Sequence, residues 1–152
     1  MRRTAMMRSH VAGALVAAFA MVASVAAHEH ATGVVKERMD AMESMAKAMK
    51  AITQRIKANR DLGSIRGDAQ AIRELAVKMT ILFPPGSNQH PSEAKPAIWQ
   101  KWPDFESKAR VLAAESDKLA QTDARDAKSI AAQARVVSQS CGKCHEVYRQ
   151  KQ

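Results

Sequence analysis

Apolar residues recur every three or four positions along most of the chain, which is the spacing of one face of an α-helix. The first stripe runs through Val35, Met39, Met42, Met45, Met49, Ile52 and Ile56, and the second through Ile72, Leu75, Ala76, Met79, Leu82 and Phe83. The third comprises Phe105, Ala109, Leu112 and Leu119, and the last comprises Ile130, Ala134, Val137, Cys141, His145 and Tyr148. No stretch alternates with the period of two that is typical of a strand. The pattern predicts four amphipathic helices.

The connections between these stripes predict how the helices are arranged. The first connection, "NRDLGS", contains Gly63 as the expected helix stop, and the last, "QTDARD", offers Thr122 or Asp123 as an N-cap. The middle one, "FPPGSNQHPSEAKP", is rich in proline and must be a loop, after which Pro103 and Asp104 suit the first turn of a helix. Short first and third connections imply antiparallel neighbours. We therefore predict an all-α fold, an antiparallel four-helix bundle.

The first 27 residues have the features of a secretory signal peptide. Three arginines and no acidic residue precede a long apolar run, and Val25 and Ala27 are small enough for a cleavage site. The alternative is an uncleaved membrane anchor, but the apolar run is shorter than the ~20 residues that a spanning helix needs. We expect residues 1–27 to be a signal peptide and residues 28–152 to form one domain. A bacterial periplasm is the expected location, without stable membrane insertion after cleavage.

The charge of the chain excludes one class of partner and suggests another. Twenty-four basic and 15 acidic residues give a formal net charge of +9, and removal of the three arginines of the leader leaves +6. Basic and acidic residues are interspersed, without a dense cluster of lysine and arginine, so we expect no nucleic-acid binding. A moderate positive charge is consistent with an ordinary solvated surface, and the alternative is electrostatic attraction to an acidic partner or membrane surface.

Near the C-terminus, the run "CGKCH" contains the only two cysteines of the chain, Cys141 and Cys144, followed directly by His145. This is the attachment signature of c-type haem. Each thiol forms a thioether with one vinyl group, and the histidine becomes an axial ligand of the iron. On a helix, Cys141 and His145 lie four residues apart and share a face. The sequence predicts one covalently bound haem c.

Three other interpretations of the motif are weaker. A thioredoxin-like redox pair requires a βαβ setting, and the chain has no strand pattern. A structural zinc site requires four ligands, but His28, His30 and His90 lie in expected tails or loops. A disulfide between Cys141 and Cys144 would close a very small loop and add little stability.

Beyond this motif, the chain resembles the class II cytochromes c, the family of cytochrome c′ and its low-spin, cytochrome c-556-like relatives. The resemblance extends from about Val34 to Arg149 and includes "VVKERMDAMESMAKAMKAI", "LFPPGS", "AKPAIWQKWPDF" and "CGKCHEVYR". The C-terminal position of the haem motif is distinctive of this class. The resemblance implies a four-helix bundle with a C-terminal haem-attachment helix.

The resemblance also implies roles for residues of the first helix. In this family an arginine is followed four residues later by the residue over the distal haem face, which places Arg38 near a haem propionate and Met42 over the iron. Cytochromes c′ proper have a non-coordinating residue there, whereas the low-spin relatives have methionine. The pattern alone leaves core packing of Met42 open, with Met45 as the second candidate ligand. Arg149 either lies beneath the proximal face or belongs to a solvated last turn.

The predicted function is single-electron transfer through a low-spin haem ligated by His145 and Met42, between redox proteins of the periplasm. If Met42 does not coordinate, the alternative is a high-spin, cytochrome c′-like protein that binds nitric oxide or carbon monoxide. The sequence shows no catalytic constellation, so we expect no enzymatic activity. The family resemblance implies a homodimer through the first two helices, which the sequence itself leaves open.

The beginning of the mature chain supports one further hypothesis. Cleavage after Ala27 would leave His28, Glu29 and His30 as the first residues, and an imidazole at the third position can complete a square-planar copper(II) or nickel(II) site. Soft thioethers of the methionine stripe could hold copper(I). The alternative is an ordinary polar tail beside a core stripe.

Overall fold

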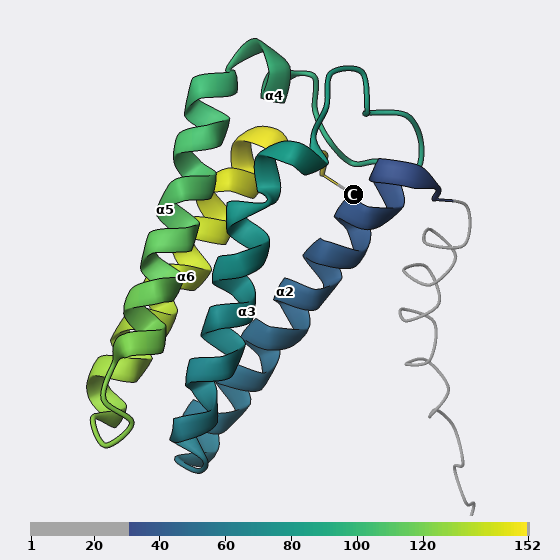
Figure 1. Ribbon diagram of the computed structural model, residues 1–152. Helices are drawn as coiled ribbons and strands as arrows, with labels where there is room; N and C mark the ends of the chain where they lie inside the picture. Colours follow the sequence, from purple (N-terminus) through teal and green to yellow (C-terminus); the bar gives the residue numbers. More distant parts are fainter. Residues whose placement is uncertain (1–30, 152) are drawn as a thin grey trace, which may run out of the picture.

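A computed structural model describes residues 31–151 of the chain, and within them the predicted antiparallel four-helix bundle is confirmed (Figure 1). The elements in chain order are α2 (Gly33–Ala58), η1 (Leu62–Ser64), α3 (Ile65–Val77), η2 (Met79–Leu82), α4 (Ala97–Gln100), α5 (Trp102–Gln121) and α6 (Ala127–Tyr148). No helix in this part of the chain is long and apolar enough to cross a membrane. The expected signal peptide and the His28–His30 tail lie outside the described residues.

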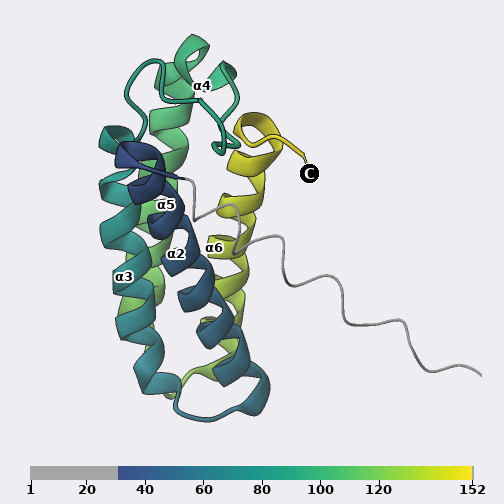
Figure 2. The same cartoon turned by 90° about the vertical axis from the view of Figure 1, so that its right-hand side faces the viewer.

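The four long helices do not pack equally. The contact between α3 and α5 is the most extensive in the bundle, whereas α2 makes few contacts with α6. Figures 1 and 2 show that α2 diverges from the other helices toward the end where α6 finishes. The C-terminus, the first turns of α2 and the loop between η2 and α4 meet at this end. This splayed end also carries the cysteine motif.

The apolar stripes form the core, as the periodicity predicts. Ile52, Ile72 and Val137 are fully buried, each on a different helix. Alanines fill much of the remaining interior, including Ala69 and Ala109 on the closely packed pair α3 and α5. Small side chains allow these two helices to approach each other, so the bundle is tight on this side and looser between α2 and α6.

One buried position on α5, Ser116, should allow a substitution that stabilises the fold. Ser116 is fully buried, and its Oγ has no hydrogen-bond partner in the described part of the chain. A buried unsatisfied hydroxyl costs roughly 1–3 kcal/mol. We expect Ser116→Ala to raise the free energy of unfolding by about 1 kcal/mol, measured by urea denaturation. Ser107→Ala, on the exposed side of the same helix, measures the stability gained from helix propensity alone. A smaller gain in stability for Ser116→Ala than for this control would contradict the prediction.

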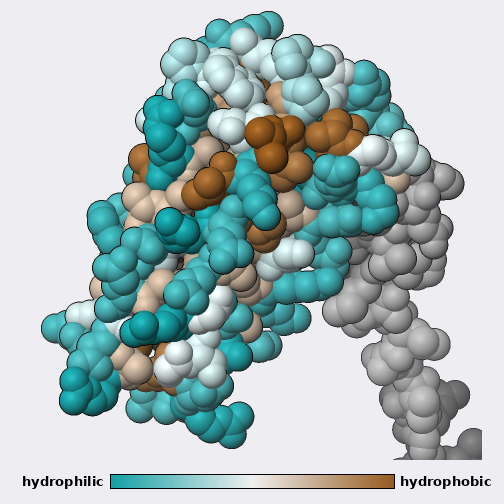
Figure 3. All heavy atoms as spheres, in the orientation of Figure 1, coloured by the Kyte–Doolittle hydropathy of each residue, from teal (hydrophilic) through white to brown (hydrophobic). Residues whose placement is uncertain are grey.

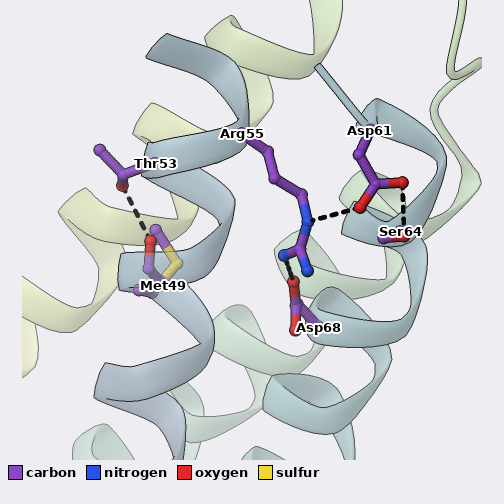
Figure 4. A network of polar contacts seen from close by, with 6 residues as sticks. All are labelled: Met49, Thr53, Arg55, Asp61, Ser64 and Asp68. Atoms are coloured by element: carbon purple, nitrogen blue, oxygen red, sulfur yellow. Dashed lines mark hydrogen bonds and ion pairs between the residues drawn. The ribbon is translucent and has the colours of Figure 1, made fainter. Parts of the chain in front are cut away.

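The turn between α2 and α3 differs from the expectation that Gly63 stops the first helix. The helix ends at Ala58, and Asn59 caps it in the left-handed conformation with φ 45°. Asparagine tolerates this conformation, so glycine is not needed. Gly63 lies instead within η1. Arg55 secures the turn through Asp61, with Nε 3.2 Å from Oδ2, and through an ion pair with Asp68 (Figure 4).

The start of α6 also differs from the sequence expectation. Asp126, not Thr122 or Asp123, is the N-cap, and its carboxylate accepts a 2.9 Å hydrogen bond from the backbone N–H of Ser129. Asp123 accepts hydrogen bonds from the backbone and side chain of the residue two positions later. Thr122 is the C-cap of α5. At the other end of α5, Pro103 occupies the first turn as predicted.

Candidate functional site

The cysteine motif lies on the last two turns of α6. Cys141 and Cys144 are half-buried and pack against the core cluster. Because the inward face of α6 continues from Val137 through Cys141 and Cys144 to Tyr148, both thiols point to the bundle side. His145 is exposed, although the sequence stripe included it. It follows Cys144 directly and lies at the solvent edge of the inward face.

The protonation of these groups follows from their surroundings. Desolvation raises the pKa of the Cys141 thiol and raises that of Cys144 to about 11. Desolvation, together with the positive charge of Arg149, lowers the pKa of His145 although its ring reaches the surface. Both thiols are therefore protonated at neutral pH. The imidazole is neutral, which is the form that binds a metal.

On α2, Arg38 is almost fully buried and is bound to the loop between η2 and α4. Its Nη2 donates hydrogen bonds to the carbonyl oxygen of Ser87 at 2.7 Å and to Oγ of Ser92 at 2.6 Å. Its Nη1 donates to Oγ of Ser87 at 3.1 Å and to the Leu82 carbonyl at 3.3 Å. The guanidinium also lies 4.4 Å from the ring centroid of Phe83. Arg38 thus fixes the loop against the first turns of α2.

The structure separates the two candidate methionines. Met45 is only 7% exposed and belongs to the hydrophobic core, so its thioether is already enclosed by protein. Met42 is half-buried at the margin of this core, one turn after Arg38 on the same side of α2. Its side chain therefore lies at the edge of the core rather than inside it.

These residues fit a flat apolar group that carries carboxylates. Among residues 31–151, Arg38 has neither an acidic partner nor an acceptor for its Nε–H, so a buried positive charge lacks its counter-charge. Burial lowers the pKa of this guanidinium, as expected for a charge without a carboxylate. Haem is a group of this kind, because it combines a flat apolar ring with two propionates.

Aromatic residues gather at the same end of the bundle, which the sequence stripes did not indicate. The ring of Phe105 lies 4.9 Å from Phe83, 5.4 Å from Trp102 and 5.4 Å from Tyr148, measured between centroids. The indole N–H of Trp99 donates a 3.0 Å hydrogen bond to the carbonyl of Phe83. Together they pack the loop onto the ends of α5 and α6.

The last residues of the described chain are fastened to this loop. Ala94 and Arg149 form an antiparallel bridge, in which Lys95 N–H donates to the Tyr148 carbonyl at 2.9 Å. The Arg149 side chain forms an ion pair with Glu93. Of the two alternatives for Arg149, a freely solvated last turn is therefore not what the structure shows. Its side chain interacts with the loop, which lies more than 50 residues earlier in the sequence.

Comparison with known proteins identifies relatives over nearly the whole described region. The family model described as "Cytochrome C'" matches residues 33–149. Cytochrome c-556 of Agrobacterium tumefaciens (strain II Chrys) is 32% identical over 121 residues, which cover 78% of this chain and 98% of that protein.

Solved structures show the same fold. Cytochrome c′ from Rhodopseudomonas palustris superimposes with a TM-score of 0.73 at 27% identity, covering 80% of this chain and 99% of that one. A nitric oxide complex of a mutant cytochrome c prime from Alcaligenes xylosoxidans gives a TM-score of 0.70 at 28% identity, with 78% and 94% coverage. The similarity therefore spans all four helices and includes the motif on α6.

Proposed function

Because this chain belongs to the cytochrome c′ family, whose members carry covalently bound haem c, we propose that it is a periplasmic carrier of single electrons with a low-spin, six-coordinate haem. It is a monohaem c-type cytochrome, and the proposal concerns its ligation and role. When bound, the haem supplies the Fe(III)/Fe(II) couple.

Five residues would hold this group. Cys141 and Cys144 would provide the two thiols for thioether bonds from the inward face of α6, and the neutral imidazole of His145 would bind the iron from the rim of the same helix. Met42 would provide a second iron ligand from α2. The Nε–H of Arg38 would donate to a haem propionate, whose charge would balance that of the guanidinium, while its other donors continue to hold the loop.

The observation that supports this role most directly is the position of Met42, half-buried at the margin of the core and one turn after Arg38. Met45 is enclosed, at 7% exposure, whereas Met39 and Met49 are partly buried as Met42 is, so burial argues against Met45 and the place next to Arg38 favours Met42. The half-buried Met42 leaves its thioether available to a ligand at the margin of the core. A His/Met pair keeps the same six ligands in both oxidation states and raises the reduction potential, which suits rapid exchange of electrons.

Optical spectra of the purified protein, before and after carbon monoxide, test the proposal. We expect low-spin spectra in both oxidation states and no change of the ferrous spectrum with the gas, because Met42 occupies the sixth position. A high-spin spectrum that shifts with carbon monoxide would favour the gas-binding alternative. The solved nitric oxide complex of the Alcaligenes relative is the precedent for that alternative. Nothing in the family relationship requires an enzymatic reaction, and we propose none.

The proposal also covers the oligomeric state of the protein and its location in the cell. Solved cytochromes c′ include dimeric forms, and we propose a homodimer through α2 and α3. Val77 and Ile81, at the end of α3 and in η2, are 61% and 72% exposed, and Figure 3 shows hydrophobic side chains on the surface near this end of the molecule. Export by residues 1–27 would deliver the chain to the periplasm, where family members typically reside.

A further inference from the structure

Tyr148 is the last residue of α6 and is buried against α5. Its side chain is 3% exposed, and the Phe105 ring packs against it edge to face, with centroids 5.4 Å apart and planes at 89°. Tyr148 follows Cys144 by four residues, so the two side chains share one face of the helix. Both pack against the same core cluster. A group bonded to Cys144 therefore lies next to the environment of this tyrosine.

The hydroxyl of Tyr148 holds a carboxylate in place. It donates a 2.6 Å hydrogen bond to Oδ2 of Asp104, in the first turn of α5, and makes a longer contact of 3.4 Å with the carbonyl of Lys101. The other carboxylate oxygen of Asp104 lies 3.5 Å from Nζ of Lys108. The hydrogen bond from Tyr148 lowers the pKa of Asp104, so this residue is a fixed negative charge at neutral pH.

The charges of this pair act on the haem-attachment helix. The pKa of Cys144 is raised mainly by desolvation, but the positive charge of Lys108 lowers it and the negative charge of Asp104 raises it. The geometry places Asp104 at this helix, because it is hydrogen-bonded to Tyr148, one turn after Cys144 on the same face of α6, and Lys108 pairs with Asp104. The two residues carry opposite charges, so their effects on a charge bound at Cys144 have opposite signs.

We propose that Asp104, held by the positioning residue Tyr148, tunes the reduction potential of the haem and that Lys108 opposes it. The proposal rests on the proposed attachment of the haem at Cys144. The oxidised centre has one more positive charge than the reduced one, because Fe(III) becomes Fe(II) by gaining one electron from an electrode or a redox dye. The nearby anion Asp104 stabilises the oxidised state and lowers the potential, whereas the cation Lys108 raises it.

The test compares three charge-neutralising substitutions on α5 in the haem-loaded protein. Asp104→Asn should raise the midpoint potential at low ionic strength, with about a threefold to tenfold shift in the Fe(III)/Fe(II) equilibrium, tenfold being about 59 mV for one electron. Lys108→Gln should lower it. Glu106 lies two residues after Asp104, on another side of α5, and its carboxylate pairs with Arg110. Glu106→Gln should therefore change the potential much less than Asp104→Asn.

Each outcome bears on the proposal. A rise for Asp104→Asn with a fall for Lys108→Gln supports it. Equal shifts for Asp104→Asn and Glu106→Gln, or no shift with an unchanged low-spin spectrum, overturn it and leave the proposed function intact. If Asp104→Asn loses its folded structure, Lys108→Gln becomes the test: a fall in its midpoint potential supports the proposal, and a rise or no change overturns it. Tyr148→Phe keeps the ring but releases the carboxylate, so its potential should lie between those of the wild type and Asp104→Asn. Failure of the proposed function itself would be visible in the wild-type spectrum, before any variant is made.

Discussion

Replacement of Met42 by leucine is expected to convert the protein from a low-spin cytochrome that ignores carbon monoxide into a high-spin one that binds it. Leucine is similar in volume, so the margin of the core stays filled, but it has no sulfur to donate to iron. The reduction potential should fall as well, because the thioether ligand favours the ferrous state. Optical titration with carbon monoxide measures the change, from no spectral response to complete conversion at saturation.

Met45→Leu is the matched control for this experiment. Met45 is enclosed in the core, and a volume-conserving exchange there should cost less than about 1.5 kcal/mol and leave the spectrum unchanged. If Met45→Leu turned high-spin while Met42→Leu stayed low-spin, the ligand would be Met45. The burial of the two side chains would then have been an unreliable guide to which sulfur is available.

Removal of Arg38 should cause the largest loss of stability of any single change considered for this chain. Arg38→Leu eliminates three hydrogen bonds to the loop, one to the last residue of η2 and the contact with the Phe83 ring, and it leaves the buried Ser87 without its partner. Hydrogen bonds to a charged group contribute roughly 1.5–3 kcal/mol each, and these four share one group and are not additive. We expect the free energy of unfolding to fall by about 3 kcal/mol or more, measured by urea denaturation of the haem-loaded protein.

Two further variants show whether the loss of stability comes from the hydrogen bonds of the Arg38 guanidinium. Arg38→Lys retains the charge but not the fork that reaches both Ser87 and Ser92, so it should be intermediate. Arg110→Leu removes an exposed arginine of α5 that pairs with Glu106, and it should cost less than about 1 kcal/mol. A loss below 1 kcal/mol for Arg38→Leu would mean that the loop holds its position without the guanidinium.

The helices and their core were predictable because burial imposes a period on the sequence. Ile52, Ile72 and Val137 belong to three of the predicted stripes and are fully buried. The same period does not show which of two neighbouring residues at the edge of a helix face is buried. Cys144 and His145 are adjacent in the sequence, and only the structure shows that the first is half-buried and the second exposed.

The helix ends were predicted less well, since several residues compete for each cap. Gly63 is the better intrinsic stop, yet Asn59 already adopts the left-handed conformation four residues earlier. Asp123 and Asp126 are equally suited to begin α6, and the bonds that Asp123 makes within its own turn leave the cap to Asp126. Propensity alone does not distinguish such alternatives.

The polar contacts of the site were out of reach of sequence reasoning. Arg38 and Ser87 are 49 positions apart, and Asp104 and Tyr148 are 44 apart. No local pattern links such pairs, because they meet only when the loop and α5 pack against the splayed end of the bundle. The family resemblance, by contrast, singled out Arg38 and Met42, and the structure shows one to be buried and the other half-buried on the same side of α2.

The central claim is that Met42 and His145 both bind the iron, and the proton NMR spectrum of the diamagnetic ferrous protein tests it most directly. The ring current of the haem shifts the methyl group of an axial methionine far upfield, outside the range of ordinary protein methyls. We predict one such three-proton resonance in the wild type, retained in Met45→Leu and absent from Met42→Leu. A ferrous spectrum without this resonance, or one in which it survives in Met42→Leu, would contradict the account.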